Sequence, residues 1–222
     1  KLMTGGQILP YGGLDLTIDN GLAYVANADS GLSIIDLADP AQPTLVGSSD
    51  YGEEAWSVAV SGSNAFVAGF SIGLAIFNVQ TPQRPSQRPF WSGRPLGPGR
   101  RVAVSGDTLL YSAGGDLHTI SVQDPDLPVY LSPVKTDGDA RSIAVKDSLV
   151  LLADLAGGLL ALDISDPRSP RKLGTPFIPP DGGEVSDVLV EGNRAFITTL
   201  KSGISTAALR VVDISDPSNM YE

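Results

Sequence analysis

An apolar run closed by Asp-Pro, or by a close variant of it, recurs five times along this chain of 222 residues. The runs are IIDLADP, IFNVQTP, TISVQDP, ALDISDP and VVDISDP, which end at Pro40, Pro82, Pro125, Pro167 and Pro217. Their successive spacings are 42, 43, 42 and 50 residues. Units of this length that consist of short alternating segments are typical of β-propeller blades or of the turns of a β-solenoid. The repeat therefore predicts five similar β-units.

The second unit indicates how one blade is built. SVAVSG (57–62) alternates and ends at a glycine, NAFVA (64–68) follows a tight turn, and GLAIFNV (73–79) precedes the proline turn. A fourth, weakly patterned run lies near 87–92. This order of strands and turns is that of a four-stranded propeller blade. No window shows sustained helical periodicity with caps, so we expect almost no helix.

The Asp-Pro pairs have a local physical explanation. Proline cannot donate a hydrogen bond to a sheet, so it ends the third strand, and the aspartate carboxylate can accept bonds from amides in the turn. We interpret all five copies as turn residues and not as a metal site or a catalytic set.

The units define one propeller domain over residues 1–222. Its approximate units are 14–55, 56–99, 100–140, 141–185 and 186–222. The fifth unit supplies only three strands, and we expect the segment 7–11 to pair with this last blade and close the ring, which removes exposed sheet edges. The alternative is that this sequence is part of a larger propeller. Its first and last blades would then pair with segments that the sequence does not contain.

Three stretches carry a family resemblance: AYVANADSGLSIIDLADPAQPTLVG (23–47), SVAVSGSNAFVAGFSIGLAIFNV (57–79) and GGLLALDISDPRSPRKLG (157–174). They resemble LVIVD repeats, which form propellers in secreted or cell-surface proteins of bacteria and archaea. The resemblance extends from about Leu14 to Pro217 and implies a propeller outside the cytoplasm without an established enzymatic activity. It carries no catalytic residues over to this chain. The sequence departs from the pattern at DLHTISV in the third unit and TPQRP in the second.

The composition excludes several kinds of site. The chain has no cysteine and one histidine, which excludes disulfides, thiolate metal sites and centres that need two imidazoles. We interpret the one histidine, His118, as an ordinary strand residue. No apolar run has the length of a membrane span. We expect neither a cofactor nor a metal ion.

Aligning the units places one residue of each first strand near the mouth of the central channel. These residues are Asp15, Ser57, Arg101, Ser142 and Asp187, and beside them lie Leu14, Trp56, Arg100, Arg141 and Ser186. Two acids, three arginines and a tryptophan around one opening are suited to a small polar ligand or a partner's side chain. The alternative is that charges of both signs solvate the mouth and pair across it.

Charge is distributed unevenly along the chain. Residues 55–106 contain no acid and five of the ten arginines, so this stretch carries +5 and the remainder −15 of the net charge of −10. The tract 82–101 is also rich in proline, and arginines with aromatic residues are common at interfaces. The candidate interface residues are Arg84, Arg88, Phe90, Trp91, Arg94 and Arg100. The alternative is an irregular outer strand whose arginines cover its own blade.

We predict a non-enzymatic scaffold outside the cell, at the cell surface or in the periplasm, that binds protein partners or neighbouring subunits. The strongly negative net charge argues against a nucleic-acid partner. The alternative function is a ligand-binding or hydrolase or lyase site at the channel mouth, with Asp15 or Asp187 as base and Arg101 and Arg141 as anion clamps.

Overall fold

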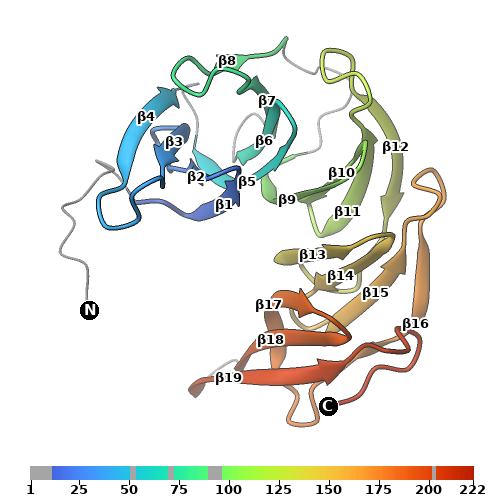
Figure 1. Ribbon diagram of the computed structural model, residues 1–222. Helices are drawn as coiled ribbons and strands as arrows, with labels where there is room; N and C mark the ends of the chain where they lie inside the picture. The colour runs from blue at the N-terminus through green and yellow to red at the C-terminus, as the bar shows by residue number, and fades with distance from the viewer. Residues whose placement is uncertain (1–11, 51–53, 70–72, 90–96, 202–203) are drawn as a thin grey trace.

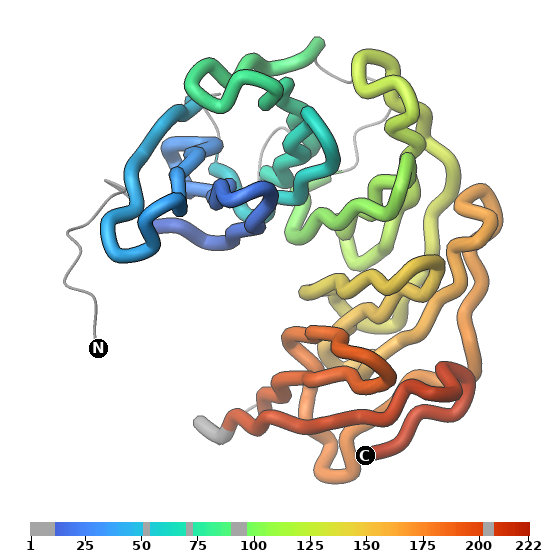
Figure 2. Tube along the Cα trace, viewed as in Figure 1, coloured from blue at the N-terminus to red at the C-terminus, as the bar shows by residue number. Residues whose placement is uncertain are grey.

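The computed structural model describes residues 12–50, 54–69, 73–89, 97–201 and 204–222. These ranges contain strands in five antiparallel sheets and no helix (Figure 1). The predicted all-β class with five propeller blades is confirmed. The sheets lie in chain order, each beside the next (Figure 2).

Four sheets have four strands and the fifth has three. The first two blades consist of β1 (Asp15–Asp19), β2 (Leu22–Ala26), β3 (Leu32–Asp36) and β4 (Thr44–Ser49), then β5 (Ala55–Ser61), β6 (Asn64–Gly69), β7 (Leu74–Asn78) and β8 (Ser86–Gln87). The third consists of β9 (Gly99–Ser105), β10 (Thr108–Ala113), β11 (Asp116–Ser121) and β12 (Val129–Val134). The fourth consists of β13 (Ser142–Lys146), β14 (Leu149–Ala153), β15 (Leu159–Asp163) and β16 (Arg171–Phe177), and the fifth of β17 (Glu184–Glu191), β18 (Arg194–Lys201) and β19 (Ile204–Asp213).

Each blade is a meander whose first strand lies on the inside. Residues of β1, β5, β9, β13 and β17 together line the central channel. The same register recurs from blade to blade: Asp15 faces Ala26 and Ala26 faces Leu32, as Asp187 faces Thr198 and Thr198 faces Leu209. This repetition explains why aligned sequence positions meet at one end of the channel.

The hydrophobic core lies between the blades. Four clusters of buried side chains join the first blade to the second, the second to the third, the third to the fourth and the fourth to the fifth. Between the first two blades, Tyr24 and Leu32 pack in one cluster with Val58 and Phe77. Each blade is therefore stabilised mainly by burial of its apolar faces against its neighbours.

The Asp-Pro turns have the predicted local chemistry. The Asp39 carboxylate accepts a bond from the Ala41 amide at 2.9 Å, and Asp166 accepts one from Arg168 at 3.0 Å. A second role becomes visible only between blades, because the Pro167 carbonyl accepts a bond of 2.6 Å from the Thr119 hydroxyl of the preceding blade. This turn thus helps to join the third blade to the fourth.

The five blades form an arc with an opening between the described parts of the first and the last blade (Figures 1 and 2). The segment 7–11, predicted to close the ring, lies outside the described residues, so closure stays a prediction. At the outer edge of the last blade, Asp213 forms an antiparallel bridge with Tyr221. Tyr221 therefore occupies the position at which the fourth strand begins in other blades, as Val129 does opposite Ser121.

Candidate functional site

The inner strands bring the predicted channel-mouth residues together. A channel of about 540 Å³ is lined by residues of all five blades, among them Asp15, Ser57, Arg101, Ser142 and Asp187. A second cavity of about 270 Å³, here called the mouth pocket, is lined by Leu14, Trp56, Arg100, Arg101, Arg141 and Ser186. Both sets are those that alignment of the units indicated, because the blades repeat with the same register.

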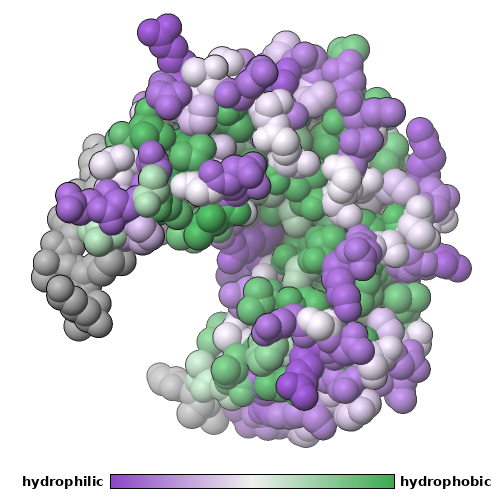
Figure 3. Space-filling model, in the orientation of Figure 1, coloured by the Kyte–Doolittle hydropathy of each residue, from purple (hydrophilic) through white to green (hydrophobic). Residues whose placement is uncertain are grey.

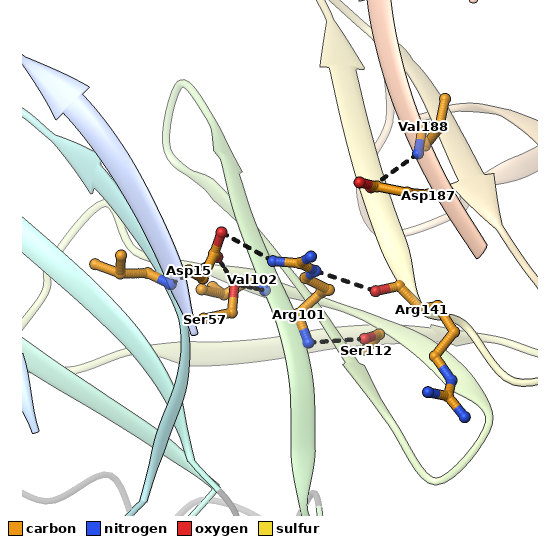
Figure 4. A network of polar contacts seen from close by, with 9 residues as sticks. Asp15, Ser57, Arg101, Val102, Ser112, Arg141, Asp187 and Val188 are labelled. Carbon is orange, nitrogen blue, oxygen red and sulfur yellow. Dashed lines mark hydrogen bonds and ion pairs between the residues drawn. The ribbon is translucent and has the colours of Figure 1, made fainter. Parts of the chain in front are cut away.

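Asp15 is the centre of a polar network across the first three blades (Figure 4). Its carboxylate accepts a 2.6 Å bond from the Ser57 hydroxyl and a 3.2 Å bond from the Val58 amide, and it pairs with Arg101 at 2.9 Å. The Ser57 oxygen in turn accepts a bond from the Val102 amide at 3.2 Å. Since Ser57 is completely buried, this network satisfies polar groups that would be costly to leave unpaired.

Arg101 continues the network to the fourth blade, where its Nε donates to the Arg141 carbonyl at 3.1 Å. Asp187 does not join it: its carboxylate accepts a bond from the adjacent Val188 amide and lies apart from the others in Figure 4. The predicted set is therefore divided into a bonded group, which spans blades one to four, and an exposed acid on blade five.

Asp139 positions the two arginines at the rim of the mouth pocket. It pairs with Nε of Arg100 at 3.3 Å and with Nε of Arg141 at 3.1 Å. The Arg100 guanidinium also lies over the Trp56 ring, 5.8 Å from its centroid, and the Trp56 indole donates to Glu54 at 3.1 Å. The acids thus orient the arginines from outside, and no carboxylate is among the described residues that line the pocket.

The loop that carries Asp139 is itself held by a buried carboxylate. Asp154, only 1% exposed, accepts bonds from the amides of Asp137 and Gly138 at 3.1 and 2.9 Å. Both bonds go to Oδ2, whereas buried Oδ1 has no partner among the described residues. Burial raises the pKa of the Asp154 carboxyl above its ordinary value of 3.8, because a charge there is poorly solvated.

The environment of Asp154 predicts that the free energy of unfolding depends on pH, and that the substitution Asp154→Asn removes this dependence. The unfolded chain loses the Asp154 proton at lower pH than the folded one, so the free energy of unfolding falls as pH rises through the raised pKa. Asparagine keeps an oxygen for the two loop amides but does not ionise. We expect the variant to gain stability relative to the wild type from about pH 3.8 upward and to match it below. Urea unfolding at a series of pH values measures this difference, and a constant difference at all pH values would contradict it.

Sequence alignment did not single out Asp139 or Asp154 for the site. A signal for Asp154 exists, because Asn27 occupies the same place after the second strand of the first blade and is also 1% exposed. Asp139 has no such signal, since its role depends on how the loop folds. Both are positioning residues that act through the arginines.

The candidate interface residues of the basic tract lie in different environments. Arg88 is turned inward, pairing with Asp126 of the third blade at 2.7 Å and donating to Asn64 at 2.9 Å. Arg84 lies exposed in a turn, and Arg100 reaches the mouth pocket. Phe90, Trp91 and Arg94 lie outside the described residues. The positive charge of the tract is therefore met in part by acids of other blades.

Outside the mouth, His118 lies in β11 with its Nδ1 3.1 Å from the Tyr130 hydroxyl. In the described ranges, no three histidine, aspartate or glutamate side chains are grouped to hold a metal ion. None of the described segments forms a helix with the length and apolarity to span a membrane.

The blade topology and channel define a β-propeller protein. The model of the LVIVD repeat matches residues 14–50, 52–86, 137–175 and 182–222. The chain therefore belongs to the LVIVD repeat family. All four strands of the third blade lie between these matches, in the unit where DLHTISV departs from the usual pattern. A comparison with curated proteins finds no match.

Solved structures of similar fold have low sequence identity to this chain. A protein from Lactobacillus plantarum is 12% identical, with a TM-score of 0.77 over 94% of this chain and 69% of that one. The computationally designed protein Ika8 is 12% identical, with a TM-score of 0.70 over 95% and 60%. PorZ, a surface component of the type-IX secretion system of Porphyromonas gingivalis, is 18% identical, with a TM-score of 0.61 over 93% and 25%. This chain thus spans between a quarter and about 70% of their lengths.

Proposed function

We propose that this protein is a non-enzymatic scaffold outside the cytoplasm that binds an acidic segment of a partner protein at the mouth pocket. The observation that carries the proposal is the lining of this pocket: three arginines and a tryptophan are among its described residues, and the acids that pair with them, Asp15 and Asp139, are not. Arginine and tryptophan in a concave site are the residue types that dominate binding energy at protein interfaces. A carboxylate that enters the pocket meets several donors at once.

The end of the basic tract contributes two arginines to the mouth pocket. Arg100 and Arg101 are the last residues of the tract and lie at the start of β9, which brings them to the channel. The location is supported by what the resemblance to LVIVD repeats implies, and by the likeness in fold to a bacterial surface component. Protein partners or neighbouring subunits would present the acidic segment.

The arrangement of the acids favours binding over catalysis. A general base needs a carboxylate oxygen directed at its substrate. The Asp15 carboxylate is engaged by Arg101, Ser57 and the Val58 amide, which occupy it from three sides. Asp187 is bonded to its own neighbour's amide and does not contact the arginines in the described network. We therefore propose no hydrolase or lyase activity.

A labelled oligoglutamate peptide tests the binding surface. We expect it to bind, to weaken as salt is added, and to bind at least about tenfold more weakly to the double variant Arg100→Ala, Arg141→Ala, because two charge-assisted contacts are lost. The measurement is fluorescence anisotropy at several salt concentrations.

The matched control removes the same charge elsewhere, through Arg168→Ala and Arg194→Ala, which are exposed and are not among the residues that line the mouth pocket. This control should leave peptide affinity nearly unchanged. Equal losses in both double variants would indicate an effect of net charge alone and overturn the proposal, as would absence of binding to the wild type.

A further inference from the structure

The mouth pocket and the central channel meet at Arg101, which lines both. Figure 3 shows the molecule hollowed at its centre, with hydrophilic and hydrophobic residues along the hollow. Most of the described residues that line the channel are aliphatic, among them Val102 and Ile143. Its volume of about 540 Å³ lies within the range of about 300–1,000 Å³ that is typical of ligand sites. A group that extends from the mouth pocket past Arg101 therefore enters a second cavity.

The two cavities differ in the charge of their described linings. The mouth pocket has three arginines and no acid, whereas the charged residues that line the channel are Asp15, Asp187 and Arg101. Because Arg101 pairs with Asp15 at 2.9 Å, Asp187 remains as the uncompensated negative charge of the channel. A ligand that is complementary to both cavities has a negative group at the mouth and a positive group inside the channel.

Asp187 stays unpaired because Arg101 is held beside the other acid. Arg101 lies two blades from Asp15 and two blades from Asp187. Its Nη1 contacts Asp15, and its Nε donates to the Arg141 carbonyl at 3.1 Å, whereas Asp187 lies apart (Figure 4). Asp187 is exposed, and its Oδ1 accepts the Val188 amide at 2.9 Å. Within the described ranges its Oδ2 accepts no bond, so this oxygen is available to a ligand.

We propose that the partner's acidic segment also carries a lysine, whose side chain enters the channel and whose ammonium group pairs with Asp187. This inference rests on the proposed function, because the acidic residues must hold the segment at the mouth pocket. The four-carbon stem of lysine packs along aliphatic side chains while its ammonium group donates to a carboxylate. The concave surroundings screen such a pair less than open solvent does. The partner is thus recognised by charges of both signs.

Two labelled oligoglutamate peptides test the inference, one with a lysine at its centre and one with a norleucine, which has the same four-carbon stem but no charge. We expect the lysine peptide to bind the wild type at least about fivefold more tightly. In Asp187→Asn the ratio of the two affinities should fall to about one, because the ion pair is lost. The amide oxygen of asparagine can still accept the Val188 bond. Fluorescence anisotropy measures both affinities.

The norleucine peptide reports separately on the mouth pocket. It should bind Asp187→Asn at least as tightly as it binds the wild type, because the arginines are unchanged. Asp147→Asn is the matched control, since Asp147 is exposed and is not among the residues that line either cavity. This variant should keep the preference for lysine.

The outcomes separate the two proposals. Equal binding of both peptides to the wild type would overturn the lysine inference and leave the proposed function in place. A preference for lysine that persists in Asp187→Asn would also overturn the inference, because another group would then bind the ammonium. Absence of binding by both peptides would overturn the proposed function and the inference with it.

Discussion

Replacing Phe77 by alanine is expected to lower the free energy of unfolding by about 3–5 kcal/mol. Phe77 is 0% exposed and lies in the cluster that joins the first blade to the second. Truncation removes a large buried side chain and leaves a cavity that the facing sheets fill only in part. Urea unfolding followed by tryptophan fluorescence measures the loss.

The part of the protein that Phe77→Ala destabilises most can also be predicted. Among the described residues, the first blade packs on one neighbouring blade only. Weakening the cluster that contains Phe77 should therefore unfold the first blade before the other blades. Hydrogen exchange should therefore increase in β1 to β4 more than in β13 to β16. Leu127→Ala provides the control, because Leu127 is 71% exposed and its truncation should change stability by less than about 0.5 kcal/mol. A loss spread evenly over all blades would contradict the nearest-neighbour account.

Gly138→Ala is expected to affect both stability and the mouth pocket. A Cβ at this position would overlap the Asp154 carbonyl and approach the Gly157 amide, both of which are backbone groups. The loop must therefore shift, at a cost of about 1–3 kcal/mol. Because Asp139 follows directly, Arg100 and Arg141 should lose their shared carboxylate and their common orientation.

Two measurements separate these effects. Urea unfolding gives the stability, and anisotropy with the oligoglutamate peptide gives the affinity of the mouth pocket at a temperature where the variant stays folded. Gly12→Ala is the matched control, since no atom lies within 4 Å of the added Cβ. A Gly138→Ala variant with wild-type urea midpoint and peptide affinity would show that the loop does not position the rim.

The sequence predicts where the residues of the channel mouth lie, but not how their side chains bond to one another. The placement of Asp15, Ser57 and Arg101 around the channel followed from aligning the repeats, because similar units have the same strand register even though their lengths differ by a few residues. The bonds among them did not follow: the Asp15 carboxylate pairs with the arginine two blades away, which depends on how side chains cross the channel. The inward direction of Arg88 is of the same kind, since it depends on Asp126 of the next blade.

The sequence by itself determined the class of fold, the number of blades and the local chemistry of the Asp-Pro turns. These properties depend on short-range patterns: alternation of apolar residues, proline's missing amide and the repeat length. Only the tertiary structure decided that Asp139 holds two arginines, that Asp154 is buried beneath their loop, and that the side chains of Leu16 and Leu209 are largely exposed. The physical reason is that burial and pairing depend on which blade packs against which, and the repeat pattern is the same for a covered face and for an open one.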